Sequence, residues 1–279
     1  MAIITVSRGP MTGGKDVAER LAATLGYPCL SHEVVAQAAI KIGVSEEMLA
    51  GKIERSAGVW ERLTTDRRRY LVAVQSALAD ACSSGNLVYH GHAGHFLLKG
   101  VPSVLRVRLV ASMSVRIRAE MARHALAYDD AREYIRSCDE ERVRWTKFVY
   151  GADWRDPANY DVVFNMEDMS LDSVCAMVAA AAQLPAYQST EAVKRTLNDF
   201  ALASRVKLAL AENSGSRAIS FNATADGGKV EVLGEVAGGG LLMKQAGPSE
   251  QEVRRIVEAI EGVKTVTVEL HWFADSEDI

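Results

Sequence analysis

A glycine-rich segment near the N-terminus has the residue types and spacing of a phosphate-binding loop. Residues 9–16, Gly-Pro-Met-Thr-Gly-Gly-Lys-Asp, fit the pattern of a glycine, four residues and then Gly-Lys. Such a loop wraps backbone N–H groups around a phosphate, which favours glycine over bulky side chains. Lys15 is expected to reach the β- and γ-phosphates of a nucleoside triphosphate. The residues predicted to hold that nucleotide are Gly9, Thr12, Gly13, Gly14, Lys15 and Asp16.

The residue after the lysine departs from the general pattern. Asp16 stands where Ser or Thr usually places a hydroxyl on Mg²⁺. A carboxylate is itself a good Mg²⁺ ligand, but it also repels a nucleotide. We therefore predict Asp16 as the metal ligand and leave the repulsive alternative open.

The elements that flank the loop are those a phosphate site needs. Apolar residues from Ala2 to Val6 predict a buried strand before it, and helical spacing from Asp16 to Leu25 predicts a helix after it. The N-terminus of that helix would offer its positive end to the anion. A glycine-rich turn without a ligand is the alternative, and this context favours the phosphate site.

Strands and helices alternate from the N-terminus to about residue 183. This alternation predicts one doubly wound α/β domain with a parallel sheet. One predicted strand, Val104 to Val110, carries two cations between apolar residues. Its Leu and Val at positions 105, 107 and 109 are expected to face inward, with Arg106 and Arg108 facing away.

The pattern changes after a predicted linker at residues 185–195. A helix, two alternating strands joined at Asp226-Gly227-Gly228, a second helix and a last strand give the order αββαβ. That order predicts a small α+β domain of roughly the smallest size that folds alone. We therefore divide the chain into a first domain at 1–184, the linker, and a second domain at 196–279.

Composition limits the partners and the compartment. The 279 residues are 48% hydrophobic and 24% charged with a net charge of -4, so no overall positive field draws in nucleic acid. The N-terminus lacks the charged start of a signal peptide, and no apolar run has the length of a membrane span. The four cysteines form no Cys-x-x-Cys pair, which suits a reducing cytoplasm. We expect a cytoplasmic protein that binds a small molecule, with membrane binding disfavoured.

Several stretches of the first domain resemble the cytidylate-kinase-like family of P-loop nucleotide kinases, over about residues 2 to 183. The longest and most specific is Asp-Trp-Arg-Asp-Pro-Ala-Asn-Tyr-Asp at 153–161. The resemblance implies a P-loop kinase fold. It also implies transfer of phosphate from ATP, with Mg²⁺, to a nucleoside monophosphate such as CMP or dCMP. The other matching stretches are residues 4–8, 25–28, 107–111 and 139–142.

The resemblance further implies an arginine-rich lid that closes over the phosphates. Phosphoryl transfer needs positive charge around the transferring group more than it needs covalent help, which explains the arginines. Arg142 and Arg144 fall in the lid helix and are predicted, with Lys15, as the catalytic cations. Arg116 precedes the lid and is a predicted substrate contact. A solvated surface arginine is the alternative for each.

Two positions predicted to lie near the acceptor depart from the family. Relatives carry Gly-Arg-Gly after the middle strand, where this chain has Gly91-His92-Ala93. Relatives often have Asp after the first helix, where this chain has Ser31-His32. Histidine is shorter than arginine and cannot make its two-pronged phosphate contact. Ser31 and His92 are therefore predicted substrate-binding residues of unusual type, and they favour a rival hypothesis, a non-catalytic nucleotide sensor.

Three histidines within residues 90–95 are the most unusual local string. Imidazoles at this spacing could bind zinc or nickel, but no nearby Cys or carboxylate completes a site. A strand end that faces the nucleotide crevice is the better interpretation, because ligands of open α/β sheets lie there.

The second domain resembles a BON domain from about Leu197 to Leu270. The features that carry this resemblance are the αββαβ order and the stretches at residues 230–236 and 260–266. The resemblance implies a module without chemistry of its own that binds a ligand or a phospholipid surface. We therefore expect a regulatory or interaction module. The sequence leaves its ligand or protein partner open, and also the oligomeric state.

Overall fold

A computed structural model describes residues 2–49, 64–91, 93–217, 219–237 and 248–273 of the chain. The described residues form two units by their contacts. The first unit draws on Met1–Val34 and Ser84–Val193. The second draws on Val35–Leu49, Leu63–Ser83 and Lys194–Ile279.

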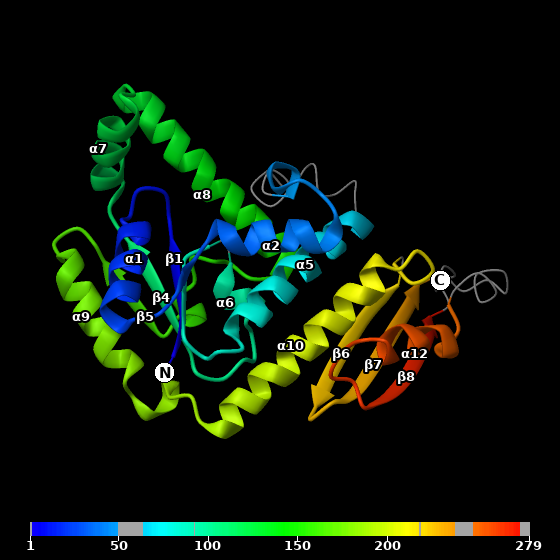
Figure 1. The fold of residues 1–279 in the computed structure, drawn as a ribbon. Coiled ribbons are helices and arrows are strands. Elements are labelled where there is room, and N and C mark those ends of the chain that lie inside the picture. Colours follow the sequence, from blue (N-terminus) through cyan, green and yellow to red (C-terminus); the bar gives the residue numbers. More distant parts are fainter. Residues whose placement is uncertain (1, 50–63, 92, 218, 238–247, 274–279) are drawn as a thin grey trace. The chain divides into compact units, whose positions relative to one another are not determined.

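The first unit is built on a sheet of five parallel strands in the order β2-β3-β1-β4-β5 (Figure 1). Because β1 lies between β3 and β4, the strand order reverses there. Ligands of open α/β sheets bind beyond the carboxyl ends of the strands at such a point. The sheet confirms the predicted parallel α/β fold. The strands are β1 (Ile3–Arg8), β2 (Cys29–Leu30), β3 (Leu87–Tyr89), β4 (Val104–Val110) and β5 (Val162–Asn165).

Helices connect these strands, and local signals set their ends. The hydroxyls of Ser112 and Ser170 cap the N-termini of α7 and α9, and Gly26 ends α1 in the left-handed conformation at φ 68°. Helices α7 and α8 lie side by side (Figure 1). Ile117 and Ile135 belong to one apolar cluster between them. Within the described ranges, no helix is long and apolar enough to cross a membrane. The helices are α1 (Gly14–Leu25), α6 (Gly94–Leu97), α7 (Met113–His124), α8 (Tyr128–Tyr150) and α9 (Leu171–Ala182).

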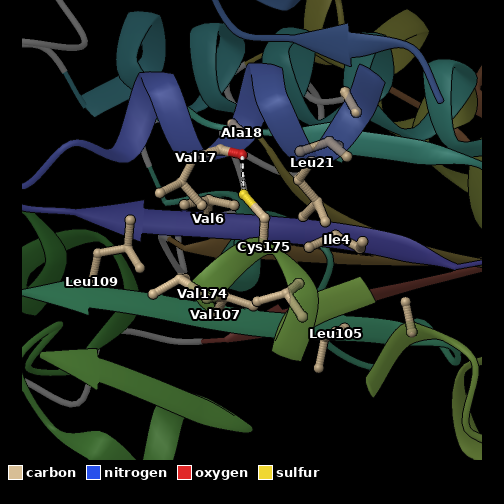
Figure 2. Packing of buried hydrophobic residues seen from close by; sticks show 14 of the residues in the cluster. Ile4, Val6, Val17, Ala18, Leu21, Leu105, Val107, Leu109, Val174 and Cys175 are labelled. Carbon is tan, nitrogen blue, oxygen red and sulfur yellow. Dashed lines mark hydrogen bonds between the residues drawn. The ribbon is translucent and has the colours of Figure 1, made fainter. Parts of the chain in front are cut away.

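The main core of the first unit joins β1 and β4 to helices α1 and α9. Figure 2 shows their apolar side chains pointing toward one another, and the Cys175 thiol donates to the carbonyl of Val17 at 3.6 Å. Each large aliphatic side chain buried in this way contributes about 1.5–3 kcal/mol. The core therefore fixes both ends of the loop that connects β1 to α1. Its labelled members are Ile4, Val6, Val17, Ala18, Leu21, Leu105, Val107, Leu109, Val174 and Cys175.

The opposite face of β4 carries its two arginines, as the alternation of the strand predicts. Arg106 donates to Asp161 at 2.6 Å and is exposed to solvent in part. Arg108 is only 8% exposed, because aromatic residues after α8 cover it. Parallel sheets are normally covered on both faces, so a cation within such a strand can become buried, as Arg108 is.

The second unit contains a sheet of three strands in the order β6-β7-β8. Strands β6 and β7 are antiparallel and are joined by Gly227 and Gly228, both with positive φ, whereas β7 and β8 are parallel. The predicted order αββαβ is present. Its elements are α10 (Glu191–Glu212), β6 (Ser220–Asp226), β7 (Lys229–Ala237), α12 (Glu250–Glu258) and β8 (Thr265–Phe273).

Most of α2 (His32–Ile42) and all described residues of α5 (Thr64–Cys82) also belong to the second unit. Polar contacts join α5 to α10. The Lys207 ammonium donates to Gln75 at 2.9 Å, and Arg69 donates to Glu212 at 2.7 Å. These bonds attach α5 to α10 within the second unit.

Candidate phosphate-binding site

The segment after β1 forms a tight loop whose backbone requires glycine at one position. Gly13 has φ 73° and ψ 14° in the left-handed region, and α1 begins directly after it at Gly14. Met11 also has a positive φ, 57°, which is uncommon for a residue with a side chain. The Val17 N–H donates to the Gly13 carbonyl at 3.0 Å, so the first turn of α1 is formed. This is the predicted sequence of strand, loop and helix.

Three consecutive carbonyls, at the end of β1 and the start of the loop, each accept a hydrogen bond from a side chain. Arg142 donates to the carbonyl of Arg8, Thr12 to that of Gly9 at 3.1 Å, and Arg116 to that of Pro10 at 2.9 Å. In a trans peptide the N–H points opposite to the carbonyl. The N–H groups of Gly9 and Met11 are therefore directed away from the two arginines. Fixed backbone donors of this kind form a concave anion site.

Gly14 is needed because of a close approach. A methyl group at this position would lie 2.1 Å from Cδ of Arg8 and 2.8 Å from its Cβ and Cγ. Real contacts of this type do not fall below 3.0 Å. The first residue of α1 thus packs directly against the last residue of β1, which sets the width of the loop.

The two charged residues that open α1 are solvent-exposed. The Lys15 side chain is 62% exposed, and its ammonium lies 3.6 Å from the carboxylate of Glu19 one turn along the helix. The exposed carboxylate of Asp16 forms no hydrogen bond or ion pair with another described side chain, although its charge raises the pKa of Arg8. Both side chains are free to reorient toward a ligand at the loop.

An excess of positive charge surrounds the loop. The pKa of Arg8 is lowered mainly by burial and secondly by the charge of Arg123. The pKa of Arg142 is lowered mainly by burial and secondly by the charge of Arg8. An arginine stays protonated near neutral pH despite such shifts. Asp139 balances one charge only, because it forms a two-pronged ion pair with Arg116 at 2.7 and 2.9 Å. The arrangement suits a polyphosphate.

The predicted lid arginines separate in the structure. Arg142 is half-buried and contacts the loop. Arg144 and Lys147 are exposed on α8, and their side chains form no hydrogen bond or ion pair with the described residues. Helix periodicity predicts that Arg142 and Arg144 point in different directions, and they do. The structure therefore brings Arg142, but not Arg144, to the loop.

A buried cation between aromatic rings was not predicted. The guanidinium carbon of Arg108 lies 4.5 Å from the ring centre of Trp154 and 5.4 Å from that of Tyr160, and Arg142 lies 5.8 Å from Trp154. Arg108 and the Tyr160 hydroxyl both donate to the Trp154 carbonyl, the latter at 2.6 Å. Burial lowers the pKa of Arg108 and raises that of Tyr160. The sequence signal that could have predicted this cluster is an arginine between apolar residues of β4, because both faces of a parallel strand are usually covered.

The histidine string has two buried members in the structure. His90 and His95 are 7% and 6% exposed, and burial lowers the pKa of His90 and takes that of His95 to about 3. His92 lies outside the described residues. Among the described residues, no group of three His, Cys, Asp or Glu side chains could hold a metal ion.

Ser31 lies at the end of β2, half-buried. Its N–H donates to the carboxylate of Glu33 at 2.7 Å, and its carbonyl accepts from the N–H of Val34. These backbone bonds form the start of α2. The serine hydroxyl has no hydrogen-bond partner among the described residues. Ser31 is therefore open to a ligand at the edge of the sheet.

More than half of the chain matches a known protein family. Residues 3–168 match the model of the cytidylate kinase-like family, a range that contains all five strands of the first sheet and the loop. A cytidylate kinase of Sulfurisphaera tokodaii is 26% identical over 179 residues, which are 64% of this chain and 93% of the relative. A cytidylate kinase of Ignicoccus hospitalis is 28% identical over 181 residues, 62% of this chain and 95% of the relative. A shikimate kinase structure from Bacteroides thetaiotaomicron has 12% identity and a TM-score of 0.41, covering 66% of this chain and 99% of that one.

Proposed function

The chain belongs to the cytidylate kinase-like family, and from this premise we propose that it transfers phosphate from ATP to a nucleoside monophosphate such as CMP or dCMP. The observation that carries the proposal is the loop between β1 and α1. Three side-chain donors hold the peptides of the loop. The positively charged side chains around it outnumber the negatively charged ones, which suits an anion. The curated relatives named above are cytidylate kinases.

In this proposal the loop binds the triphosphate. The amides of Gly9, Gly13 and Gly14 surround the phosphates, and Lys15 turns from Glu19 to reach the β- and γ-phosphates. An exposed ion pair one turn apart is worth only about 0.3–0.5 kcal/mol, so releasing Lys15 from Glu19 costs little. The Thr12 hydroxyl closes the loop by its bond to Gly9.

Mg²⁺ is the metal that we propose to accompany ATP, and Asp16 is its proposed ligand. The fit rests on the exposed Asp16 carboxylate, which has no ion-pair partner among the described residues and stands at the N-terminus of α1. A hard oxygen ligand of this kind is what Mg²⁺ prefers. When bound, the metal neutralises charge that develops on the phosphate oxygens. The protein contributes by holding the Asp16 carboxylate beside the loop.

Arg142 and Arg144 are the proposed cations for the transferring phosphate. Arg142 already lies at the loop, where it is bonded to the Arg8 carbonyl, and it would turn from that bond toward the phosphate. No contact among the described residues brings the exposed Arg144 to the loop. Positive charge placed where negative charge develops is the main contribution of protein to this reaction. We therefore expect Arg142 to matter more than Arg144.

The acceptor is proposed to lie near Ser31 and His92, beyond the carboxyl ends of β2 and β3. The half-buried hydroxyl of Ser31 supports this role, because a hydroxyl can donate to a sugar or phosphate oxygen. A small nucleotide is the proposed partner, and nucleic acid is not, given the net charge of -4.

We propose the domain limits 1–184, 185–195 and 196–279 and a BON-like regulatory module at the C-terminus. The αββαβ order of the second unit supports the module. The four cysteines, all free in the structure, support a reducing cytoplasm as the compartment.

A non-catalytic nucleotide sensor is the second candidate. It is favoured by Ser31 and His92, which stand where the family resemblance leads us to expect acidic and arginine side chains. In that case ATP binds at the loop, and the second unit reports the bound state to a partner.

A turnover assay separates the two candidates. ADP release from MgATP would be followed with CMP, dCMP, UMP and AMP as acceptors, with a Lys15→Ala variant as the matched control. The kinase proposal predicts acceptor-dependent ADP formation that the variant lacks. Tight ATP binding with no turnover on any acceptor would favour the sensor.

A further inference from the structure

The ion pair of Arg116 and Asp139 joins three separate parts of the first unit. Arg116 is on α7, Asp139 is on α8, and the Nε of Arg116 donates to the carbonyl of Pro10 in the loop at 2.9 Å. Both terminal nitrogens of Arg116 bind the two carboxylate oxygens of Asp139. The Arg116 side chain is 10% exposed and that of Asp139 is 24% exposed. At least three of the five N–H groups of this guanidinium are therefore used inside the protein.

The pair also packs against the loop backbone. A methyl group on Gly9 would lie 3.1 Å from a terminal nitrogen of Arg116 and 3.5 Å from a carboxylate oxygen of Asp139. Glycine at position 9 thus lets the pair sit directly over the start of the loop. Movement of the pair would be transmitted to Gly9 and Pro10 without an intervening side chain.

An apolar cluster joins α7 and α8 in addition to the pair. Ile117, Ala131 and Ile135 already form an apolar cluster between these helices, with Met121 and Leu126 packed against it. Ser112 caps α7 independently. Besides its bonds between the two helices, the pair adds a directional contact to Pro10.

The loop has a specific need for that contact. The peptide between Pro10 and Met11 precedes the left-handed Met11, at φ 57°. A non-glycine residue in this region costs about 1–3 kcal/mol and persists only where its surroundings hold it. The bond from Arg116 fixes the carbonyl of this peptide and so the direction of the Met11 N–H.

We propose that Asp139 and Arg116 are positioning residues for ATP: Asp139 orients Arg116, and Arg116 holds the Pro10–Met11 peptide so that its N–H faces the phosphates. The inference rests on the proposed function of the loop. It gives Arg116 a role through the loop backbone, in place of the direct substrate contact that the sequence predicts. Removal of the pair would release the orientation of the Pro10–Met11 peptide and so weaken ATP binding, whether or not an acceptor is bound.

Calorimetry with MgATP and with inorganic tripolyphosphate tests this on the full chain. Asp139→Asn keeps the shape of the carboxylate and removes its charge. Arg116→Lys keeps the positive charge and removes the planar guanidinium that makes the two-pronged contact. Glu133→Gln is the matched control, because it removes an exposed two-pronged pair with Arg136 on the same helix. We expect the Kd of both ligands to rise by about tenfold or more in the first two variants and by less than about twofold in the control.

Three further readouts separate positioning from a merely structural role. Asp139→Glu keeps the charge and should restore part of the affinity. The double variant Asp139→Asn/Arg116→Lys should bind no worse than the weaker single variant, because the two residues act as one unit. With an accepted substrate, KM for ATP should rise more than kcat falls.

Contrary results are equally specific. A lowered melting temperature in Asp139→Asn with unchanged Kd values would overturn the inference, since the pair would then only stabilise the fold. A fall in kcat at unchanged ATP affinity would overturn it too, because Arg116 would act on the transferring group. If Asp139→Asn does not fold, Arg116→Lys decides by the same criteria. Absence of ATP binding by the unchanged protein would refute the proposed function itself, and the inference with it.

Discussion

Replacing Gly14 by alanine is the smallest change that should disable the loop. The added methyl would lie 2.1 Å from Cδ of Arg8, which a rotamer change could relieve. It would also lie 2.8 Å from Cβ of Arg8, which is fixed to the backbone and cannot turn away. Either β1 or the start of α1 must therefore shift. Overpacking of this kind costs about 1–3 kcal/mol, and misplacing a binding group by about 1 Å can cost about a hundredfold in activity.

The assay is calorimetric binding of MgATP together with a thermal melt. We expect Gly14→Ala to weaken ATP binding by about tenfold to a hundredfold and to lower the melting temperature by a few degrees. Gly26→Asn at the other end of α1 is the control, because no atom lies within 4 Å of an added Cβ and Asn tolerates left-handed backbone. Equal affinities and melting temperatures for the two variants would refute the argument from the close contact.

Three further changes test other features of the two units. Glu19→Gln frees Lys15 from an exposed pair worth about 0.3–0.5 kcal/mol, so calorimetry at low salt should show about twofold tighter ATP binding; weaker binding would contradict this. The pKa of His95 is lowered to about 3, mainly by burial, so below pH 6.5 the unfolded chain binds a proton that the folded chain excludes. The free energy of unfolding should therefore fall by on the order of 4 kcal/mol from pH 6.5 toward pH 3. In His95→Phe the urea midpoint of unfolding should depend less on pH across that range. Parallel pH profiles for the variant and the unchanged protein would contradict this prediction. Glu212→Gln removes the charge that faces Arg69 and should lower the free energy of unfolding by about 1 kcal/mol in urea titration; no change would show the pair to be neutral.

The sequence predicts the elements of the first sheet well because their signals are local. Apolar runs mark β1 and β4, and Gly13 and Gly14 mark the loop between them and α1. The αββαβ order of the second unit was predicted for the same reason, since Gly227 and Gly228 mark the turn between alternating strands. Short-range patterns of this kind depend only on neighbours along the chain.

The contacts that hold the loop were not predicted from the sequence. Arg116 and Pro10 are far apart along the chain, as are Arg108 and Trp154, and no spacing rule connects them. Helix periodicity separates Arg142 from Arg144, but only the packing of α8 decides which of them meets the loop.

The most direct test of the central claim is calorimetry of ATP on the unchanged protein and on Lys15→Ala, with and without Mg²⁺. The Lys15 side chain is exposed, so its removal should leave the melting temperature unchanged. We expect saturable MgATP binding by the unchanged protein and a loss of about a hundredfold or more in the variant, because a charged phosphate contact is removed. Equal binding by both proteins, or binding by neither, would contradict the assignment of the loop as the triphosphate site.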